Sequence, residues 1–378
     1  MNTVCTINQC TGCSLCVEVC PKNVVSLAKE LDSYNAIKGD GCISCKLCEK
    51  MCPQNSPVKF KEQIQWYQGW ALSDETRSRA ASGGVATELA RLTVNNGGAV
   101  VSCTFKEGDF LFQLAENESE LRKFSGSKYI KSNPAGIYKI VKDKIKEKVV
   151  LFIGLPCQVA ALTSYLRHVD TNNLITVDLI CHGTPSIEYL WLYLAGYKVD
   201  LSTLDDIKFR VNDVYSLKAS GYKNLHPGIR DLYMMSFLDS VCYTENCYNC
   251  QYATLKRVSD ITLGDSWGSD LPNEEWEKGI SLILCQTSKG KDLVEAAALH
   301  LDDVDISKAI DHNHQLRTPS VPKGDRNKFM TVLKSKRNIK SAYIKVFPKQ
   351  FIKRIVKIIF YSGGRVKCDP FSIYYKQK

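Results

Sequence analysis

Two short segments near the N-terminus repeat one cysteine pattern. They are CTGCSLCVEVCP, over Cys10–Pro21, and CISCKLCEKMCP, over Cys42–Pro53, and both follow the spacing C-x2-C-x2-C-x3-C-P. A 4Fe–4S cluster needs four thiolates around it, and a tight loop with cysteine at every third position supplies three of them. The fourth cysteine then projects away and serves the other cluster of a two-cluster fold.

The predicted ligand sets are therefore crossed between the two segments. One cluster takes Cys10, Cys13, Cys16 and Cys52, and the other takes Cys42, Cys45, Cys48 and Cys20. The alternative is a pair of zinc sites, but tetrahedral zinc is typically held by two C-x2-C pairs, which leaves the third and fourth cysteine of each segment unexplained. Cys5 stands outside the pattern and is expected to pack as a small apolar residue.

Four later cysteines could form a third cluster site. Cys157 and Cys181 each lie in a turn between a strand-like and a helix-like run, and such turns gather at the carboxyl edge of a parallel sheet. Cys247 and Cys250 form a C-x2-C pair, which is half of a metal site or a redox dithiol. We expect the four to meet around a 4Fe–4S cluster, although each of the first two could instead be a buried structural cysteine. The rival fourth ligands are Cys103 and Cys242.

Alternating runs between about Trp66 and Leu301 must position these cysteines. Helix patterns cover residues 84–98, 134–148, 156–166, 184–196 and 291–301, and strand patterns cover residues 99–105, 149–154, 174–180, 260–264 and 280–287. This alternation predicts an α/β main domain with a largely parallel or mixed sheet, behind a small N-terminal α+β ferredoxin-like domain. The expected domains are residues 1–60, 66–320 and a basic tail, 321–378.

Composition places further limits on the class of protein. None of the sequence is apolar for long enough to cross a bilayer, and the start of the chain does not read as a signal peptide, so we expect a cytoplasmic protein. Seventeen cysteines in a reducing compartment favour metal binding or redox work over disulfides. The net charge of +10 arises in the tail, which carries +14 from Pro322 onward, so it says little about the main body.

Six ordered motifs carry a resemblance to a known family. They are RAASGGVATELA, GSKYIKS, GLPCQVAAL, DLICHGTPS, CYNCQYA and DITLGDSWG. From about Gln68 to Leu301 the chain resembles the beta-subunit family of coenzyme F420 hydrogenase and dehydrogenase, and its first 57 residues resemble bacterial-type ferredoxins. The resemblance implies an iron–sulfur cluster beside FAD, with Cys157, Cys181, Cys247 and Cys250 as the motif cysteines.

Two glycine-containing loops are candidates for holding FAD. A helix start with close-lying glycine suits a pyrophosphate, and the resemblance points to the same loops. The candidate residues are Ser82, Gly83 and Gly84 in the first loop, and Ser127, Lys128 and Tyr129 in the second. Either loop could be an ordinary turn, and no G-x-G-x-x-G fingerprint is present.

His182 and Asp265 are the candidate catalytic residues. His182 follows Cys181 and could hydrogen-bond the flavin or donate a proton, or could be tied to a local carbonyl. Asp265 and Trp267 follow a strand, so they are expected at the sheet edge.

The sequence thus predicts an iron–sulfur flavoprotein oxidoreductase. Electrons would pass from the clusters through FAD to a small organic acceptor, such as a deazaflavin coenzyme or an activated sugar, or in the reverse direction. The alternative is a non-catalytic electron-transfer subunit that feeds a partner enzyme. A redox partner protein is expected in both cases, and no motif supports a nucleic-acid partner. An amphipathic basic helix over residues 349–364 could lie on an anionic membrane or pack on the domain.

Overall fold

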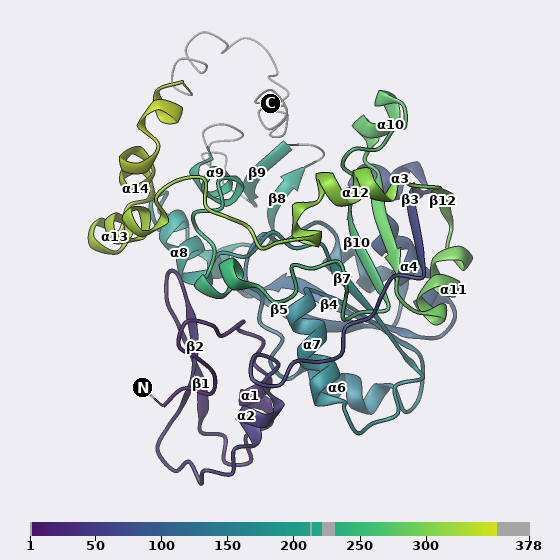
Figure 1. Cartoon of the computed structure of the whole chain (residues 1–378), viewed down its shortest axis with the longest axis horizontal. Coiled ribbons are helices and arrows are strands. Elements are labelled where there is room, and N and C mark those ends of the chain that lie inside the picture. The colour runs from purple at the N-terminus through teal and green to yellow at the C-terminus, as the bar shows by residue number, and fades with distance from the viewer. Residues whose placement is uncertain (1, 212–213, 221–230, 354–378) are drawn as a thin grey trace.

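The computed structural model describes residues 2–211, 214–220 and 231–353 (Figure 1). One sheet of eight strands has the order β12-β3-β11-β10-β7-β6-β4-β5. The strands are β3 (Gln65–Ala71), β4 (Ala99–Lys106), β5 (Asp109–Ala115), β6 (Val150–Gly154), β7 (Leu174–Leu179), β10 (Ile261–Asp265), β11 (Ser281–Cys285) and β12 (Leu299–Asp302). Strands β4, β6, β7 and β10 are parallel neighbours, and the other pairs are antiparallel. The predicted α/β class with a mixed sheet is confirmed.

Helices cover both faces of the sheet because the central strands are apolar on both sides. Ala99 and Val101 of β4 pack with α6 (Ile137–Lys144) and α7 (Pro156–Tyr165). Val100, between them, points to the other face and packs with α4 (Val85–Asn95) and α11 (Ser288–Ala296).

The predicted helix over residues 291–301 is wrong at its C-terminal end. Helix α11 stops at Ala296, and Leu299–Asp302 is the edge strand β12, paired antiparallel with β3. Helical periodicity continues through this stretch of sequence, but hydrogen bonding to β3 overrides local propensity. The sequence also left β3 and β5 unassigned.

The N-terminal segment folds as a small antiparallel hairpin with two short helices. The elements are β1 (Val25–Lys29), β2 (Tyr34–Lys38), α1 (Leu15–Glu18) and α2 (Leu47–Met51). This unit lies against α6 and α7 (Figure 1). Glu18 accepts hydrogen bonds from the backbone N–H groups of Gly136 and Lys139 at the start of α6. The hydroxyl of Tyr138 in α6 donates to the carbonyl of Cys13 over 2.7 Å. The first cysteine loop is therefore bonded directly to a helix of the main domain.

Ten further helices and strands complete the described part of the chain. They are α3 (Asp74–Arg79), α5 (Glu118–Leu121), α8 (Ile187–Ala195), β8 (Ile207–Val211), β9 (Val214–Ala219), α9 (Leu232–Leu238), α10 (Asn273–Lys278), α12 (Ile306–His312), α13 (Arg326–Lys336) and α14 (Ile339–Val346), with short 3-10 turns between some of them. Most of the expected amphipathic tail helix lies outside the described residues. In the part of the chain that is described, no helix is both long and apolar enough to span a membrane.

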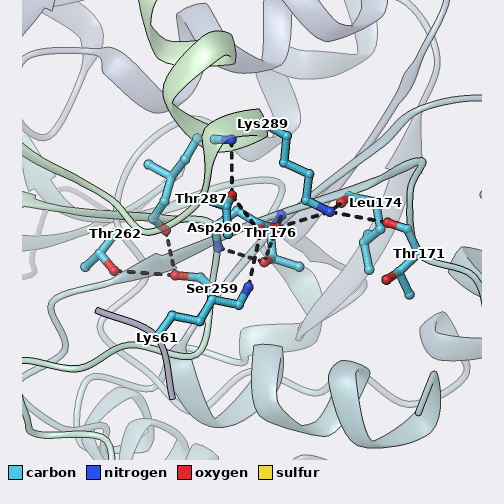
Figure 2. Close-up of polar contacts among 11 residues, drawn as sticks. Lys61, Thr171, Leu174, Thr176, Ser259, Asp260, Thr262, Thr287 and Lys289 are labelled. Atoms are coloured by element: carbon cyan, nitrogen blue, oxygen red, sulfur yellow. Dashed lines mark hydrogen bonds and ion pairs between the residues drawn. The ribbon is translucent and has the colours of Figure 1, made fainter. Parts of the chain in front are cut away.

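A polar network at the amino end of β10 binds the linker that follows the N-terminal unit (Figure 2). Asp260 accepts hydrogen bonds of 2.8 Å from both the N–H and the hydroxyl of Thr176, and one of 3.0 Å from Thr287. Lys61 of the linker pairs with Asp260 at 3.1 Å, and Lys289 lies 3.9 Å away. Burial would raise the pKa of Asp260, but Lys61, Lys289 and the bonds from Thr176 together lower it.

Replacing Asp260 by alanine should lower the free energy of unfolding by about 3 kcal/mol, because the buried N–H of Thr176 loses its acceptor. The measurement is the urea midpoint followed by tryptophan fluorescence without oxygen. The exposed pair of Asp143 with Lys146 provides the control, since Asp143→Ala should leave the midpoint almost unchanged. Because the pKa of Asp260 in the folded protein lies below its ordinary value of 3.8, the ionised carboxylate stabilises the fold above pH 3.8. The difference in the free energy of unfolding between wild type and Asp260→Asn should therefore shrink as the pH falls below 3.8. Equal midpoints for Asp260→Ala and the control would contradict this role.

Candidate functional site

A cavity of about 190 Å³ lies in the N-terminal unit and is lined by four of its cysteines. These are Cys20, Cys42, Cys45 and Cys48, one of the two crossed sets expected from the spacing. Burial opposes ionisation of Cys20, but backbone N–H groups from Lys22 to Val25 lower its pKa. Four thiols around an open space, with N–H donors directed at a sulfur, fit a 4Fe–4S cluster.

The other crossed set lies deeper in the same unit. Cys10, Cys13, Cys16 and Cys52 are all buried and interact electrostatically with one another. The N–H of Gly12 donates to the sulfur of Cys10 over 3.4 Å. Cys5 is also buried in this group, and its side chain interacts with those of Cys10 and Cys52. Cys5 therefore packs as expected but lies directly beside the sulfurs of the proposed ligands.

The two cysteine loops share one backbone shape. Ser14 and Lys46 occupy equivalent positions in the two repeats and both have φ of 59°. Gly12 and Ser44, two residues earlier in each repeat, have φ of 70° and 54°. Left-handed residues are unfavourable outside glycine, so their recurrence indicates that the loop is shaped to direct its cysteines inward.

A third group of four cysteines lines a second cavity, at the carboxyl edge of the main sheet. Cys157 opens α7 after β6, and Cys181 follows β7. Cys247 lies in the turn at Glu245–Asn249, and Cys250 directly follows that turn. Burial and then the neighbouring thiols Cys247 and Cys250 raise the pKa of Cys181 to about 12. A bound cluster would have to supply the charge that removes these protons.

The size of the second cavity bears on what could enter it. Its open volume is about 30 Å³, so the surrounding side chains must part to admit a cluster. The donor set nevertheless fits chemically, since four thiols face one space. Across the described ranges, no three His, Cys, Asp or Glu side chains converge as they would around one metal ion.

The two rival cysteines lie elsewhere. Cys103 is on β4, where burial raises the pKa of its thiol to about 11. Cys242 is fully buried in the core with Tyr189 and Tyr233, and neither cysteine lines the second cavity. Cys242 is thus packed among aromatic rings and does not face the other proposed ligands.

The second cavity is bounded by residues from both parts of the chain. Thr11 and Gln54 come from the N-terminal unit, and Gln315, Pro319 and Ser320 come from the segment after α12. The site is thus in contact with the loop that carries Cys10 and Cys13.

Two cations near this cavity were missed by the sequence analysis. Arg257 lines it and pairs with the buried Asp178 at 2.9 Å. Lys131 lines it as well and is only 5% exposed. The signal that could have found Lys131 is its place in the motif GSKYIKS, two residues beyond the tyrosine singled out there.

His182 lines the second cavity, whereas Asp265 does not. His182 Nδ1 lies 2.6 Å from Gln315 Nε2, which also lies 2.7 Å from His314 Nε2. Because an amide nitrogen is a donor, His182 Nδ1 accepts and its ring proton sits on Nε2. Burial, and then the neighbouring His314, lower the pKa of His182 to about 3, so the ring is neutral at pH 7. A hydrogen bond from the side chain of Gln315, rather than one to a local carbonyl, orients the imidazole ring of His182.

Asp265 forms a separate polar group at the end of β10. It pairs with Arg210 of β8 at 3.2 Å. The ring of Tyr129 interacts electrostatically with both Arg210 and Asp265, and its side chain hydrogen-bonds toward Ser127. The second flavin loop is therefore joined to Asp265. Trp267, nearby in sequence, packs its ring 5.6 Å from that of Trp276.

The two loops expected to bind FAD differ in how closely the rest of the protein packs against them. Ser82 and Gly83 hydrogen-bond to Ile280 and Ser281, and a Cβ at Gly83 would lie 2.5 Å from a backbone oxygen of β3. Close packing against the sheet therefore explains this glycine. In the second loop, Lys128 donates to the carbonyls of Phe124 and Ser125, while nothing lies within 4 Å of a Cβ built at Gly126. The second loop therefore has open space at its glycine, whereas the first is packed against β3.

Both loops nevertheless lie at the sheet edge that carries Cys181. Asp265 of β10 pairs in register with Ser281 of β11, and the N–H of Gly83 donates to the Ser281 hydroxyl. The first loop is therefore next to the end of β10.

Two family models and a solved structure match parts of this chain. Residues 9–56 match the family model described as a 4Fe-4S dicluster domain, and residues 147–307 match the model that describes the C terminus of the coenzyme F420 hydrogenase/dehydrogenase beta subunit. Among solved structures, a chain of the F420-reducing [NiFe] hydrogenase complex from Methanosarcina barkeri matches with 15% identity and a TM-score of 0.48, covering 68% of this chain and 91% of that one. No curated protein matches the sequence.

The expected resemblance is therefore confirmed over two parts of the chain. The chain is thus similar to a 4Fe-4S dicluster domain over residues 9–56, and to the C terminus of the coenzyme F420 hydrogenase/dehydrogenase beta subunit over residues 147–307.

Proposed function

We propose that this protein is an iron–sulfur oxidoreductase that moves electrons between its dicluster domain and an organic acceptor by way of a third 4Fe–4S cluster. The observation that carries the proposal is the second cavity, where four cysteines face one space that is also lined by Thr11 of the first cysteine loop. The third cluster would be held by Cys157, Cys181, Cys247 and Cys250.

The dicluster domain would exchange electrons with a redox partner protein. Cys45 is exposed, and so are the apolar side chains of Ile43 and Leu47 that flank it. The deeper set, with Cys10 and Cys13, is buried against the main domain. Electrons would therefore enter or leave at the Cys45 side and pass inward.

FAD is the proposed organic cofactor, held mainly by Ser127, Lys128 and Tyr129, with Ser82, Gly83 and Gly84 at the neighbouring strand ends. When bound, it supplies the conversion between one-electron and two-electron chemistry. In this proposal Arg210 orients the side chain of Asp265 beside Tyr129. His182 keeps its Nε2 proton available as a donor because Gln315 occupies Nδ1. The acceptor belongs to the class of small organic hydride acceptors, such as a deazaflavin or an activated sugar.

The second candidate is a non-catalytic electron-transfer subunit. The same exposed Cys45 surface favours it, because a subunit of this kind needs only a protein partner at each end. Turnover of a small molecule by the isolated chain separates the two functions.

Anaerobic purification with iron, sulfide and flavin quantified per chain tests the proposal. We expect about twelve irons and about one FAD per chain, as three 4Fe–4S clusters and one flavin require. About eight irons would remove the third cluster. Twelve irons without flavin would leave the electron-transfer subunit as the function, and zinc in place of iron would exclude both.

A further inference from the structure

Lys131 is a buried cation between two groups of cysteines. The first group, which would hold the first cluster, is Cys10, Cys13, Cys16 and Cys52, and the third group, which would hold the third cluster, is Cys157, Cys181, Cys247 and Cys250. Its Nζ donates a 3.1 Å hydrogen bond to the carbonyl of Thr11, which lies between Cys10 and Cys13. The same Nζ lies 3.5 Å from Asn246 Oδ1, next to Cys247. One ammonium group therefore touches the loop of each proposed cluster.

The surrounding structure holds this side chain in place. The N–H of Lys131 donates to the carbonyl of Pro185, and its ammonium lies 5.6 Å from the centre of the Tyr34 ring. Gly12 makes room for it: a Cβ there would lie 2.9 Å from Lys131 Cδ and 2.6 Å from the Tyr34 ring. A side chain at position 12 would displace the lysine, so glycine is required for this close approach as well as for its φ of 70°.

No carboxylate balances this charge in the described ranges, where Lys131 forms no ion pair with Asp or Glu. A buried ammonium without an anion is strongly unfavourable. Burial would lower the pKa of Lys131, but Cys247, Cys157, Tyr34 and Cys10 together raise it. The clusters that the two cysteine groups would hold carry the negative charge that compensates the lysine.

We propose that the ammonium of Lys131 is the shared counter-ion of the first and third clusters and raises the reduction potential of both. This inference rests on the proposed function, because it requires a third cluster. Reduction adds one negative charge to a cluster, and a fixed cation nearby in a low-dielectric interior favours that added charge. A cation placed between two clusters favours the electron on either of them, which eases its passage from one to the other. Lys131 is therefore a positioning and tuning residue that touches no substrate.

The test compares neutral and charged replacements in the whole cluster-loaded protein. Potentiometric titration followed by electron paramagnetic resonance, with iron counted in each sample, gives the potential of every cluster. In Lys131→Met and Lys131→Gln we expect the one-electron reduction constants of the first and third clusters to fall about tenfold, a shift of about 59 mV to lower potential. The potential of the cluster at Cys20, Cys42, Cys45 and Cys48 should not move. Lys131→Arg keeps the charge and should restore the wild-type values.

Lys38 supplies the matched control. It is paired with Glu49 at 2.6 Å and interacts with Cys48 and Cys42. Lys38→Met should therefore shift only the potential of the cluster at Cys20, Cys42, Cys45 and Cys48. Unchanged potentials in Lys131→Gln with a full complement of iron would overturn the inference. A shift as large in Lys131→Arg as in Lys131→Gln would overturn it too, because the charge would not be the cause. If the wild-type protein holds only about eight irons, the proposed third cluster is wrong. A shift in the potential of the first cluster alone would then still show that the charge of Lys131 acts on that cluster.

Discussion

Replacing Cys247 by serine should remove about four irons per chain and leave both clusters of the dicluster domain intact. The reason is that Cys247 lines the second cavity with three other thiols, and among the described residues no further cysteine lines that cavity to take its place. Iron and sulfide analysis gives the loss directly. Electron paramagnetic resonance of the dithionite-reduced protein should then lack one of three cluster signals. Electrons supplied by a reductant should still reach the dicluster domain but no longer pass to the acceptor.

Cys103→Ser is the matched control for this experiment. Cys103 was one of the two rival fourth ligands, yet it lies on β4 and does not line the second cavity. The Cys103 variant should therefore keep all of its iron. Loss of iron from Cys103→Ser but not from Cys247→Ser would reverse the assignment. Full iron in both variants would mean that the second cavity holds no cluster.

Replacing Arg257 by methionine should have the largest effect on stability, lowering the free energy of unfolding by about 4 kcal/mol. Arg257 is 2% exposed and Asp178 fully buried, and Nη2 lies 2.9 Å from Asp178 Oδ1. Among the described residues, the other carboxylate oxygen, Oδ2, has no hydrogen-bond partner. Removing the guanidinium leaves a buried carboxylate without compensation, and it also frees the carbonyls of Tyr252 and Leu179. The urea midpoint measured without oxygen gives the change.

The neighbouring Lys256 provides a control, and a double variant tests the cause. Lys256 pairs with Glu62 at 2.6 Å, but both side chains are more than half exposed, so Lys256→Met should cost less than about 1 kcal/mol. Arg257→Met combined with Asp178→Leu should recover most of the loss, because no buried charge is then left unpaired. A double variant as unstable as the single one would show that the arginine acts through its carbonyl contacts instead.

Much of the fold could be predicted because local patterns match the elements that form. The run GVATELARLTVNNGG contains α4, and the strands β4, β6, β7, β10 and β11 lie within or overlap the apolar runs identified in the sequence. The failure at β12 has a tertiary cause, since residues Leu299–Asp302 gain a strand conformation only from pairing with β3. The order of strands in the sheet is likewise a property of packing and not of any one segment.

The sequence by itself determined the chemistry that the N-terminal unit can perform. Iron–sulfur ligands separated by two or three residues sit in one loop, so their geometry follows from local backbone conformation, which the repeated φ of 59° at Ser14 and Lys46 illustrates. The family motifs likewise named the four later cysteines without showing that they meet.

Only the tertiary structure decided how these parts are joined. Cys157, Cys181 and Cys247 come from different strand ends and turns, and their approach depends on the register of β6 and β7 and on the turn that follows α9. The position of Lys131 between Thr11 and Asn246 links residues more than 100 positions apart. Such placements depend on the packing of the whole chain, because long-range contacts form only when distant segments bury their surfaces together.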